Sequence, residues 1–206
     1  LNQSYSAIEI ILVNASKADL SGVDVGQERI IVLNPESALS RAEAANSGLD
    51  AASGDYLMFL DDDDWISINH VQDLLTALRT NSNVQATYSS AQKTNHEGLL
   101  LEHIFETEYD PYLLMRDNYI PIHTVLFEKS LVTQGCRFDN TFEIYEDWDF
   151  WLQLSQHTDF KHVPNITAFY RTGGNSGTDI RDQAIRYDPT SKIGKARSSI
   201  YEKWKN

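Results

Sequence analysis

The feature that most constrains the fold is a series of short apolar runs that alternate with stretches of helical periodicity. Apolar runs occur at Ile8 to Val13, Ile30 to Leu33 and Tyr56 to Leu60. Each run is too short for a helix and nearly continuous, which is typical of strands buried on both faces of a parallel sheet. Between the last two runs, a capping box at Ser40 begins an alanine-rich helical stretch that continues to Gly54. This order predicts a strand-helix-strand crossover and an α/β fold.

The same signals extend the pattern along the rest of the chain. They predict helices that begin at Ser67, Asp110, Glu128 and Asp147, and strands at Ala86 to Ser90 and Thr124 to Phe127. The second half is less regular than the first. We find no internal repeat and no low-complexity linker, so we expect a single domain over residues 1–206.

Composition limits the partners and the cellular setting. The 206 residues include 17 Lys and Arg against 30 Asp and Glu, which gives a net charge of -13. This is the wrong sign for neutralising phosphates, so nucleic acid is not expected as a partner. The single Cys136 excludes an intrachain disulfide and a cysteine-rich zinc site, and no apolar run approaches the ~20 residues needed to span a bilayer. We interpret the chain as soluble and intracellular, and Leu1 as a trimmed start.

Residues 186–206 differ in charge from the rest of the chain. They hold six Lys and Arg against two acidic residues, whereas residues 1–185 carry an excess of acidic groups. The segment is therefore predicted to be a basic helix on an acidic body. We expect this helix to be solvated or paired within the molecule, and contact with a membrane surface is the alternative.

An acidic tetrad, Asp61 to Asp64, directly follows the apolar run Tyr56 to Leu60. In open α/β sheets, ligands bind outside the carboxyl ends of the strands. Four adjacent carboxylates repel one another, so their concentration there suggests a compensating hard divalent cation such as Mg²⁺ or Mn²⁺. A solvated acidic turn is the other interpretation of the tetrad. No glycine-rich phosphate loop is present, so nucleotide binding would depend on metal and carboxylates.

Several short motifs occur in a fixed order along the chain. They are Gln3-Ser4-Tyr5 before the Ile8-to-Val13 run, Asn46 with Gly48, Gly54, Leu60 with the tetrad, and Tyr145-Glu146-Asp147-Trp148-Asp149-Phe150-Trp151. This ordered set resembles the motifs of glycosyltransferase family 2. The resemblance implies the GT-A fold, a Rossmann-like three-layer α/β/α sandwich with a mostly parallel central sheet.

The resemblance also implies roles on the donor side. Asp63 would bind Mn²⁺ or Mg²⁺ with support from Asp61, and Asp62 would lie near the ribose of a nucleotide-diphosphate sugar. Relatives carry V-D-D-G-S at the end of the strand that corresponds to Ile8 to Val13, and the carboxylates of that motif help to bind the nucleotide base. This chain has Asn14-Ala15-Ser16 at that position. Asn14 is the donor-side candidate at that position. Arg171, which precedes the glycine-rich run 173–177, is a candidate for a second positive contact with the donor.

On the acceptor side, the resemblance makes Asp147 the catalytic base and Glu146 the residue that orients the acceptor. A carboxylate in the first turn of a helix is favoured in its ionised form, which agrees with a base. Simple capping of the helix N-terminus is the alternative role for this pair. His123 resembles a position near the acceptor side, but we interpret it as a buried structural histidine.

The resemblance further divides the chain into a nucleotide-sugar half at about residues 1–90, an acceptor half at about 91–185 and the basic C-terminal helix at about 186–206. The family begins with a strand that should lie roughly thirty residues before Ile8, and that first strand is apparently absent. A sheet without it would expose two edges, to be filled by more chain, another segment or a second subunit, as in a homodimer.

We therefore expect a metal-dependent, inverting glycosyltransferase that moves a sugar from a nucleotide-diphosphate donor to a hydroxyl of a glycan or lipid-linked acceptor. The alternative is a non-catalytic GT-A-like module that binds nucleotide, glycan or a partner. A metal-dependent nucleotidyltransferase is a third hypothesis, but the chain lacks a lysine-containing phosphate loop. The resemblance implies a role in the assembly of a bacterial surface polysaccharide. It also implies a cytoplasmic location, and peripheral attachment to the inner face of the cell membrane is the alternative.

Overall fold

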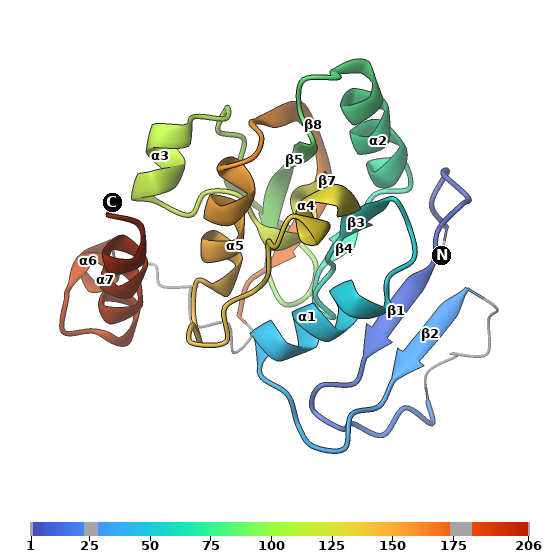
Figure 1. The fold of residues 1–206 in the computed structure, drawn as a ribbon, viewed down its shortest axis with the longest axis horizontal. Coiled ribbons are helices and arrows are strands. Elements are labelled where there is room, and N and C mark those ends of the chain that lie inside the picture. The colour runs from blue at the N-terminus through green and yellow to red at the C-terminus, as the bar shows by residue number, and fades with distance from the viewer. Residues whose placement is uncertain (1, 23–28, 174–182, 206) are drawn as a thin grey trace.

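A computed structural model describes residues 2–22, 29–173 and 183–205 (Figure 1). The strands are β1 (Ile10–Val13), β2 (Ile30–Leu33), β3 (Tyr56–Met58), β4 (Trp65–Ile66), β5 (Ala86–Thr94), β6 (Leu100–Phe105), β7 (Val125–Glu128) and β8 (Phe160–Arg171). The helices are α1 (Arg41–Ala51), α2 (His70–Thr80), α3 (Pro111–Arg116), the 3-10 helix η1 (Ile122–Thr124), α4 (Lys129–Thr133), α5 (Glu146–Ser155), α6 (Gln183–Tyr187) and α7 (Lys192–Trp204).

The strands form two sheets. β1 and β2 pair in parallel, and a six-stranded sheet has the order β3-β7-β5-β8-β4 with β6 also paired to β5. In the larger sheet only β5 and β8 run parallel, so the expectation of a mostly parallel sheet is wrong. For the pair β5–β6 the reason is local, because a short hairpin joins these strands and reverses the chain without the long crossover that a parallel pair needs. The other antiparallel pairs, β3–β7, β5–β7 and β4–β8, join strands that are far apart in the sequence.

The crossover expected after β2 is also modified. α1 follows β2 as predicted. However, β3 does not pair with β2 but lies in the larger sheet, where it pairs antiparallel with β7. Two predicted boundaries move as well: α1 ends at Ala51 rather than near Gly54, and the N-cap of α2 is Asn69 rather than Ser67. The predicted cap of α3 is confirmed, because the Asp110 side chain accepts hydrogen bonds from the first turn.

Three strands, β4, β6 and β8, were not predicted from the sequence. β8 contains Pro164, which is unfavourable inside a central strand because it cannot donate to the ladder. Ser89 of β5 pairs with Val163 and the next residue, Ser90, pairs with Ile166. Pro164 therefore lies at an irregularity where the pairing between β8 and β5 is interrupted. β6 lacks a clear alternation of buried and exposed side chains, and its Leu100 is exposed.

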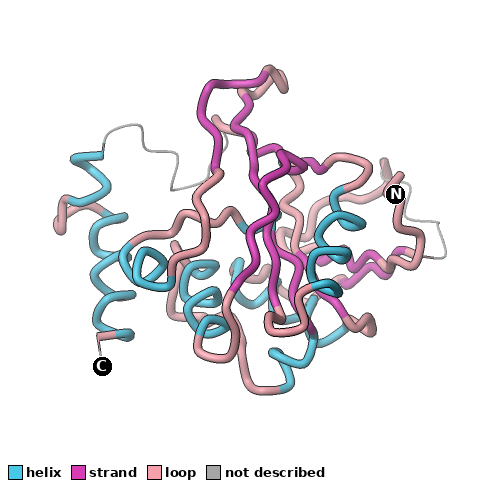
Figure 2. The backbone as a smooth tube through the Cα atoms, turned by 90° about the horizontal axis from the view of Figure 1, so that it is seen from above, coloured by secondary structure: helices cyan, strands magenta, loops and turns pink. Residues whose placement is uncertain are grey.

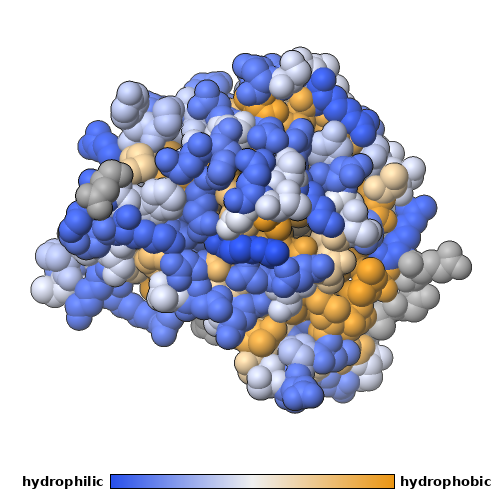
Figure 3. Space-filling view, in the orientation of Figure 1, coloured by the Kyte–Doolittle hydropathy of each residue, from blue (hydrophilic) through white to orange (hydrophobic). Residues whose placement is uncertain are grey.

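Helices cover both faces of the larger sheet, which gives three layers (Figures 1 and 2). On β7, alternate side chains point to opposite faces: Leu126 packs against α2, while Val125 and Phe127 join the main core. α5 is buried nearly all round, and its two tryptophans are fully buried in that core. Figure 3 shows a largely hydrophilic outer face, with apolar side chains gathered around β1.

The basic C-terminal segment is paired within the molecule. Five of its six cations bind acidic residues of the body or of the segment itself, in the pairs Arg186–Asp117, Arg197–Asp117, Lys192–Glu143, Lys203–Asp139, Lys203–Asp149 and Lys205–Glu202. These pairs match the intramolecular alternative given above. Among the described residues, the helices are all too short or too polar to cross a bilayer.

Asn46 joins α1 to the segment that follows α4. Its side-chain amide donates to the backbone oxygen of Phe138 at 2.8 Å and accepts from the Phe138 N–H at 3.0 Å. These bonds satisfy both backbone groups of a residue whose side chain is buried in the core. Asn46 thus has a structural role, because it fixes α1 against this segment.

We predict that Asn46→Ala lowers the free energy of unfolding by about 1–3 kcal/mol, because it leaves two half-buried backbone groups unpaired. Ser47→Ala is the matched control: its hydroxyl bonds only to Glu43 within the same helix, so a change within about 0.5 kcal/mol is expected. Urea unfolding followed by tryptophan fluorescence measures both. Equal midpoints for the two variants would contradict the assignment.

Candidate functional site

The acidic tetrad lies in the loop between β3 and β4 and faces a cavity of about 270 Å³. The other residues that line this cavity are Arg41, Tyr170 and Arg171. Arg41 is the first residue of α1, and Tyr170 and Arg171 end β8. Segments that are far apart in the sequence therefore meet at the position where the sequence predicted a ligand site.

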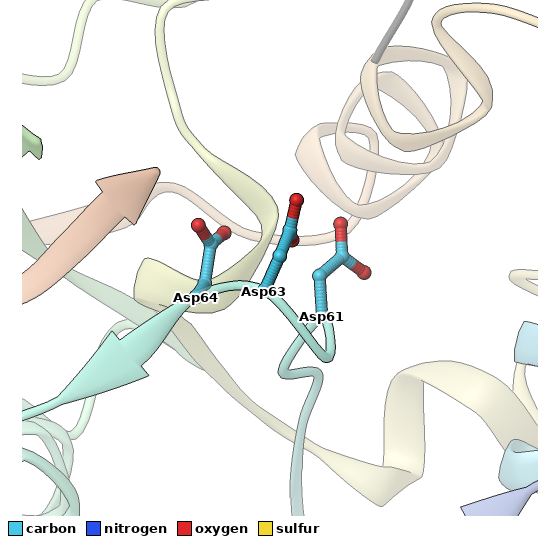
Figure 4. Close-up of side chains that lie close together, drawn as sticks. All are labelled: Asp61, Asp63 and Asp64. Carbon is cyan, nitrogen blue, oxygen red and sulfur yellow. The ribbon is translucent and has the colours of Figure 1, made fainter. Parts of the chain in front are cut away.

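Three of the four carboxylates form a cluster that could hold a cation. One oxygen each from Asp61, Asp63 and Asp64 lies within 4.8 Å of the others, and Figure 4 shows the three side chains projecting from the same side of the loop. Burial, and then the charges of Asp64 and Asp61, raise the pKa of Asp63 above its usual value. Burial and the like charges beside it therefore both disfavour the ionised form of Asp63, and a bound cation would offset them.

Asp64 is held by the protein on both of its oxygens. Its side chain is 2% exposed, with Oδ2 at 2.9 Å from Nδ1 of His123 and Oδ1 accepting the Arg171 backbone N–H at 2.8 Å. His123 is fully buried, and its ring stacks on Tyr170. This agrees with the expected structural histidine. Asp64 thus ties the tetrad loop to η1 and to the end of β8.

Arg41 links the tetrad to the N-terminus of α5. Its Nη2 lies 2.9 Å from Oδ2 of Asp61, and its Nε lies 2.6 Å from Oε1 of Glu146. Although burial lowers the pKa of Arg41, the charges of Asp61 and Glu146 outweigh that effect and raise it above its usual value. One permanent positive charge therefore joins the predicted donor side to the predicted acceptor side.

Glu146 and Asp147 open α5 directly after Tyr145, which adopts a left-handed backbone conformation with φ of 67°. Glu146 is nearly buried, whereas Asp147 stays partly exposed. Asp147 accepts hydrogen bonds from the Trp148 backbone N–H at 2.8 Å and from Nδ2 of Asn118 at 2.9 Å. These two hydrogen bonds hold the carboxylate in one orientation.

The protonation of Asp147 differs from the expectation. Burial, and then the charge of Glu146, raise its pKa to about 7, although Asn118, the Trp148 N–H and Arg41 act in the opposite direction. The expected preference for the ionised form at the helix N-terminus is outweighed by burial. A pKa close to the working pH is the value at which a general base is most effective.

Of the remaining candidates, Arg171 and Asp62 line the cavity and Asn14 does not. Arg171 lines it, with its guanidinium 5.4 Å from the ring centre of Trp65, and the glycine-rich run 174–177 beyond it lies outside the described residues. Asp62 also lines the cavity and is exposed. Asn14 follows β1 and is not one of the residues that line the cavity; its amide donates to Asn34 and Ala18.

Two residues of the site were missed by sequence reasoning. Arg41 was seen only as part of a capping box, and Asn118 was not singled out. A cation in the first turn of a helix opposes the helix dipole, so its presence at Arg41 is a signal that anions lie nearby. We find no comparable signal for Asn118, whose partner lies 29 residues further along the chain.

Comparison with known proteins gives a consistent result for the sequence. The model of the family described as Glycosyl transferase family 2 matches residues 1–181. An uncharacterized glycosyltransferase of Haemophilus influenzae is 29% identical over 216 residues, which cover 98% of this chain and 84% of that protein.

Solved structures share the fold at low sequence identity. S. aureus TarS, crystallised with UDP-GlcNAc, superposes with a TM-score of 0.71 at 14% identity, covering 100% of this chain and 65% of that one. The mannosyltransferase PcManGT from Pyrobaculum calidifontis, in complex with GDP-Man and Mn²⁺, gives a TM-score of 0.62 at 14% identity, covering 84% and 51%. This chain thus spans less than two thirds of either structure. The likeness shows that the fold is GT-A.

We predict that the four aspartates differ in their effect on stability. Asp64→Ala should lower the free energy of unfolding by about 1–3 kcal/mol, because it leaves the Arg171 N–H and the buried His123 without their partner. Asp62→Ala should leave stability unchanged within about 0.5 kcal/mol or raise it slightly, because it only relieves repulsion. Chemical denaturation without metal or nucleotide distinguishes them. A greater loss in Asp62→Ala would refute the structural role of Asp64.

Proposed function

Because the chain belongs to glycosyl transferase family 2, we propose that it transfers a sugar, with inversion, from a nucleotide-diphosphate donor to a hydroxyl of a glycan or lipid-linked acceptor. The main support is the double ion pair of Arg41, which lines the cavity together with Asp61 and also binds Glu146 at the start of α5. A solvated acidic turn, or a pair that only caps α5, would not need such a bridge.

The donor side is proposed to bind a divalent cation, Mn²⁺ or Mg²⁺, through Asp63 and Asp61. Their donor set consists of carboxylate oxygens, which suit a hard cation, and the raised pKa of Asp63 indicates negative charge that lacks compensation. When bound, such an ion supplies a Lewis acid that neutralises charge on the departing diphosphate. Asp62 and Asn14 are proposed to contact the nucleoside, and Arg171 the diphosphate.

The acceptor side is proposed to work through Asp147 and Glu146. Asp147 takes the proton of the acceptor hydroxyl as the oxygen attacks the anomeric carbon from the face opposite the leaving diphosphate. Glu146 positions the acceptor, and its pairing with Arg41 keeps its own charge close to a cation. The new glycosidic bond forms as the bond to the diphosphate breaks, and the proton remains on Asp147.

The raised pKa of Asp147 leads to a pH dependence with a definite sign. Asp147 must be ionised to act as the base, so kcat should rise about tenfold per pH unit below pH 7 and level off above it. Asp147→Asn should lower kcat by about 10²- to 10⁴-fold and abolish this acidic limb. Steady-state release of nucleotide from the donor sugar, measured from pH 5.5 to 9, provides the profile. Wild-type turnover in Asp147→Asn would eliminate Asp147 as the base.

Binding of metal and nucleotide can be tested without an acceptor. We expect UDP, GDP or dTDP to raise the melting temperature only with Mn²⁺ or Mg²⁺, with a stabilisation of about 2.7 kcal/mol at a hundredfold excess over Kd. Asp63→Asn should remove the metal-dependent shift. Asp55→Asn, an exposed carboxylate just before β3, is the charge-matched control and should keep it.

The possible outcomes separate the alternatives. A shift that is the same with and without metal would refute the metal site. Metal-dependent binding without turnover of any donor, over a range of acceptors, would favour the non-catalytic module over the enzyme.

A further inference from the structure

The hydrogen bond between Asn118 and Asp147 is fixed by residues that play no part in the chemistry proposed above. Asn118 belongs to the segment after α3, and its Nδ2 donates to Oδ2 of Asp147 at 2.9 Å. The other oxygen, Oδ1, accepts the Trp148 N–H at 2.8 Å. Each carboxylate oxygen accepts more than one hydrogen bond, so both bonds can persist while an acceptor hydroxyl approaches.

The residue before Asn118 anchors this segment to the C-terminal helices. Asp117 Oδ1 accepts from Nη2 of Arg186 at 2.6 Å and from Nη1 of Arg197 at 2.8 Å. The backbone oxygen of Arg116 accepts from Nη2 of Arg197 at 2.7 Å. The backbone leading to Asn118 is therefore held by two arginines from α6 and α7.

Arg197 also contacts the residue that follows Asp147 in α5. Its guanidinium lies 5.2 Å from the ring centre of Trp148, the residue after Asp147, and its side chain is only 3% exposed. The Trp148 Nε1 donates to the backbone oxygen of Leu114 in α3. A single buried cation thus contacts both the Asp117 segment and the start of α5.

The contacts of Arg197 are not needed merely to attach α7 to the rest of the molecule. The far end of α7 has its own anchor, where Lys203 and Trp204 bind the buried Asp149 in α5. Burying the charge of Arg197 is unfavourable unless its hydrogen bonds are fixed, so this cation favours one geometry of the Asp117 segment.

We propose that Arg197 and Arg186 are positioning residues, which act through Asp117 to hold Asn118 against the carboxylate of Asp147. The basic C-terminal segment is then a brace for the base. The catalytic meaning of this brace depends on the proposed function, in which Asp147 accepts the proton. The brace itself is a statement about geometry that can be tested without any substrate.

The direct test is the titration of Asp147 by ¹³C NMR of aspartate carboxyl groups, with the resonance assigned by its loss in Asp147→Asn. The charged and polar groups that face Asp147 are Glu146 on α5, Arg41 on α1 and Asn118. The Asn118 N–H stabilises the ionised carboxylate, so Asn118→Ala should raise the pKa of Asp147 further. Asn118→Asp should raise it more, because it replaces a donor with a second negative charge.

The brace is tested by substitutions in α7. Arg197→Lys keeps the charge but loses the forked contacts to Asp117 and Arg116, so it should raise the pKa of Asp147 and speed solvent exchange of the Asn118 side-chain amide. Lys203→Met loosens the far end of α7. Lys192→Ala, also on α7, removes the exposed pair between Lys192 and Glu143. Both controls should leave the titration of Asp147 unchanged, even where Lys203→Met lowers the melting temperature.

Turnover provides the second readout. Asn118→Ala and Arg197→Lys should lower kcat by on the order of tenfold to a hundredfold near pH 6.5, with partial recovery at pH 8.5, and leave the KM for the donor unchanged. If Arg197→Lys leaves the Asp147 titration as in wild type, or if Lys203→Met shifts it equally, the brace is refuted. If the titration shifts but Asp147→Asn keeps full activity, the brace stands and the proposed base is wrong.

Discussion

The compensation of clustered negative charge by Arg41 is the interaction on which the site depends. The tetrad and the Glu146–Asp147 pair carry six carboxyl groups in an acidic chain, and Arg41 contacts both groups. Its position at the start of α1 is unfavourable with respect to the helix dipole, and two carboxylates offset that cost. The capping box at Ser40 and the bonds of Asn46 to Phe138 fix α1, so they also fix where this cation lies.

A second cation, Arg197, has a comparable place beside the start of α5. Arg41 joins the tetrad to α5 near the surface, whereas Arg197 is buried among aromatic rings beside Asp117. The chain has few cations relative to its acidic groups, and the C-terminal segment uses most of its own for pairs within the molecule. A basic stripe in the sequence therefore contributes to internal electrostatics here, which leaves little net positive charge for a membrane surface.

The parts of this fold that could be predicted are those with local causes. The strand Ile30–Leu33 follows from its apolar run, and the start of α3 follows from the side-chain cap at Asp110. The turn at Gly135, where φ is 104°, follows from the freedom of glycine to adopt a positive φ. The direction and pairing of β7 could not be predicted, because its partners β3 and β5 lie far from it in the sequence. The motifs located the tetrad and Asp147. The contacts of Arg41 and Asn118 stayed hidden because they join residues 105 and 29 positions apart.

Four identical residues in a row acquire four environments because the loop turns between two strands. Asp64 points inward to His123, Asp63 is crowded by its neighbours, Asp61 pairs with Arg41 and Asp62 faces outward. No spacing rule distinguishes them, since the difference arises from the chain that returns to the loop from η1 and β8. A cation held by Asp61 and Asp63 would share Asp61 with Arg41, and Arg41 also holds Glu146. The charge of the tetrad and the charge of the Glu146–Asp147 pair are therefore coupled through one guanidinium.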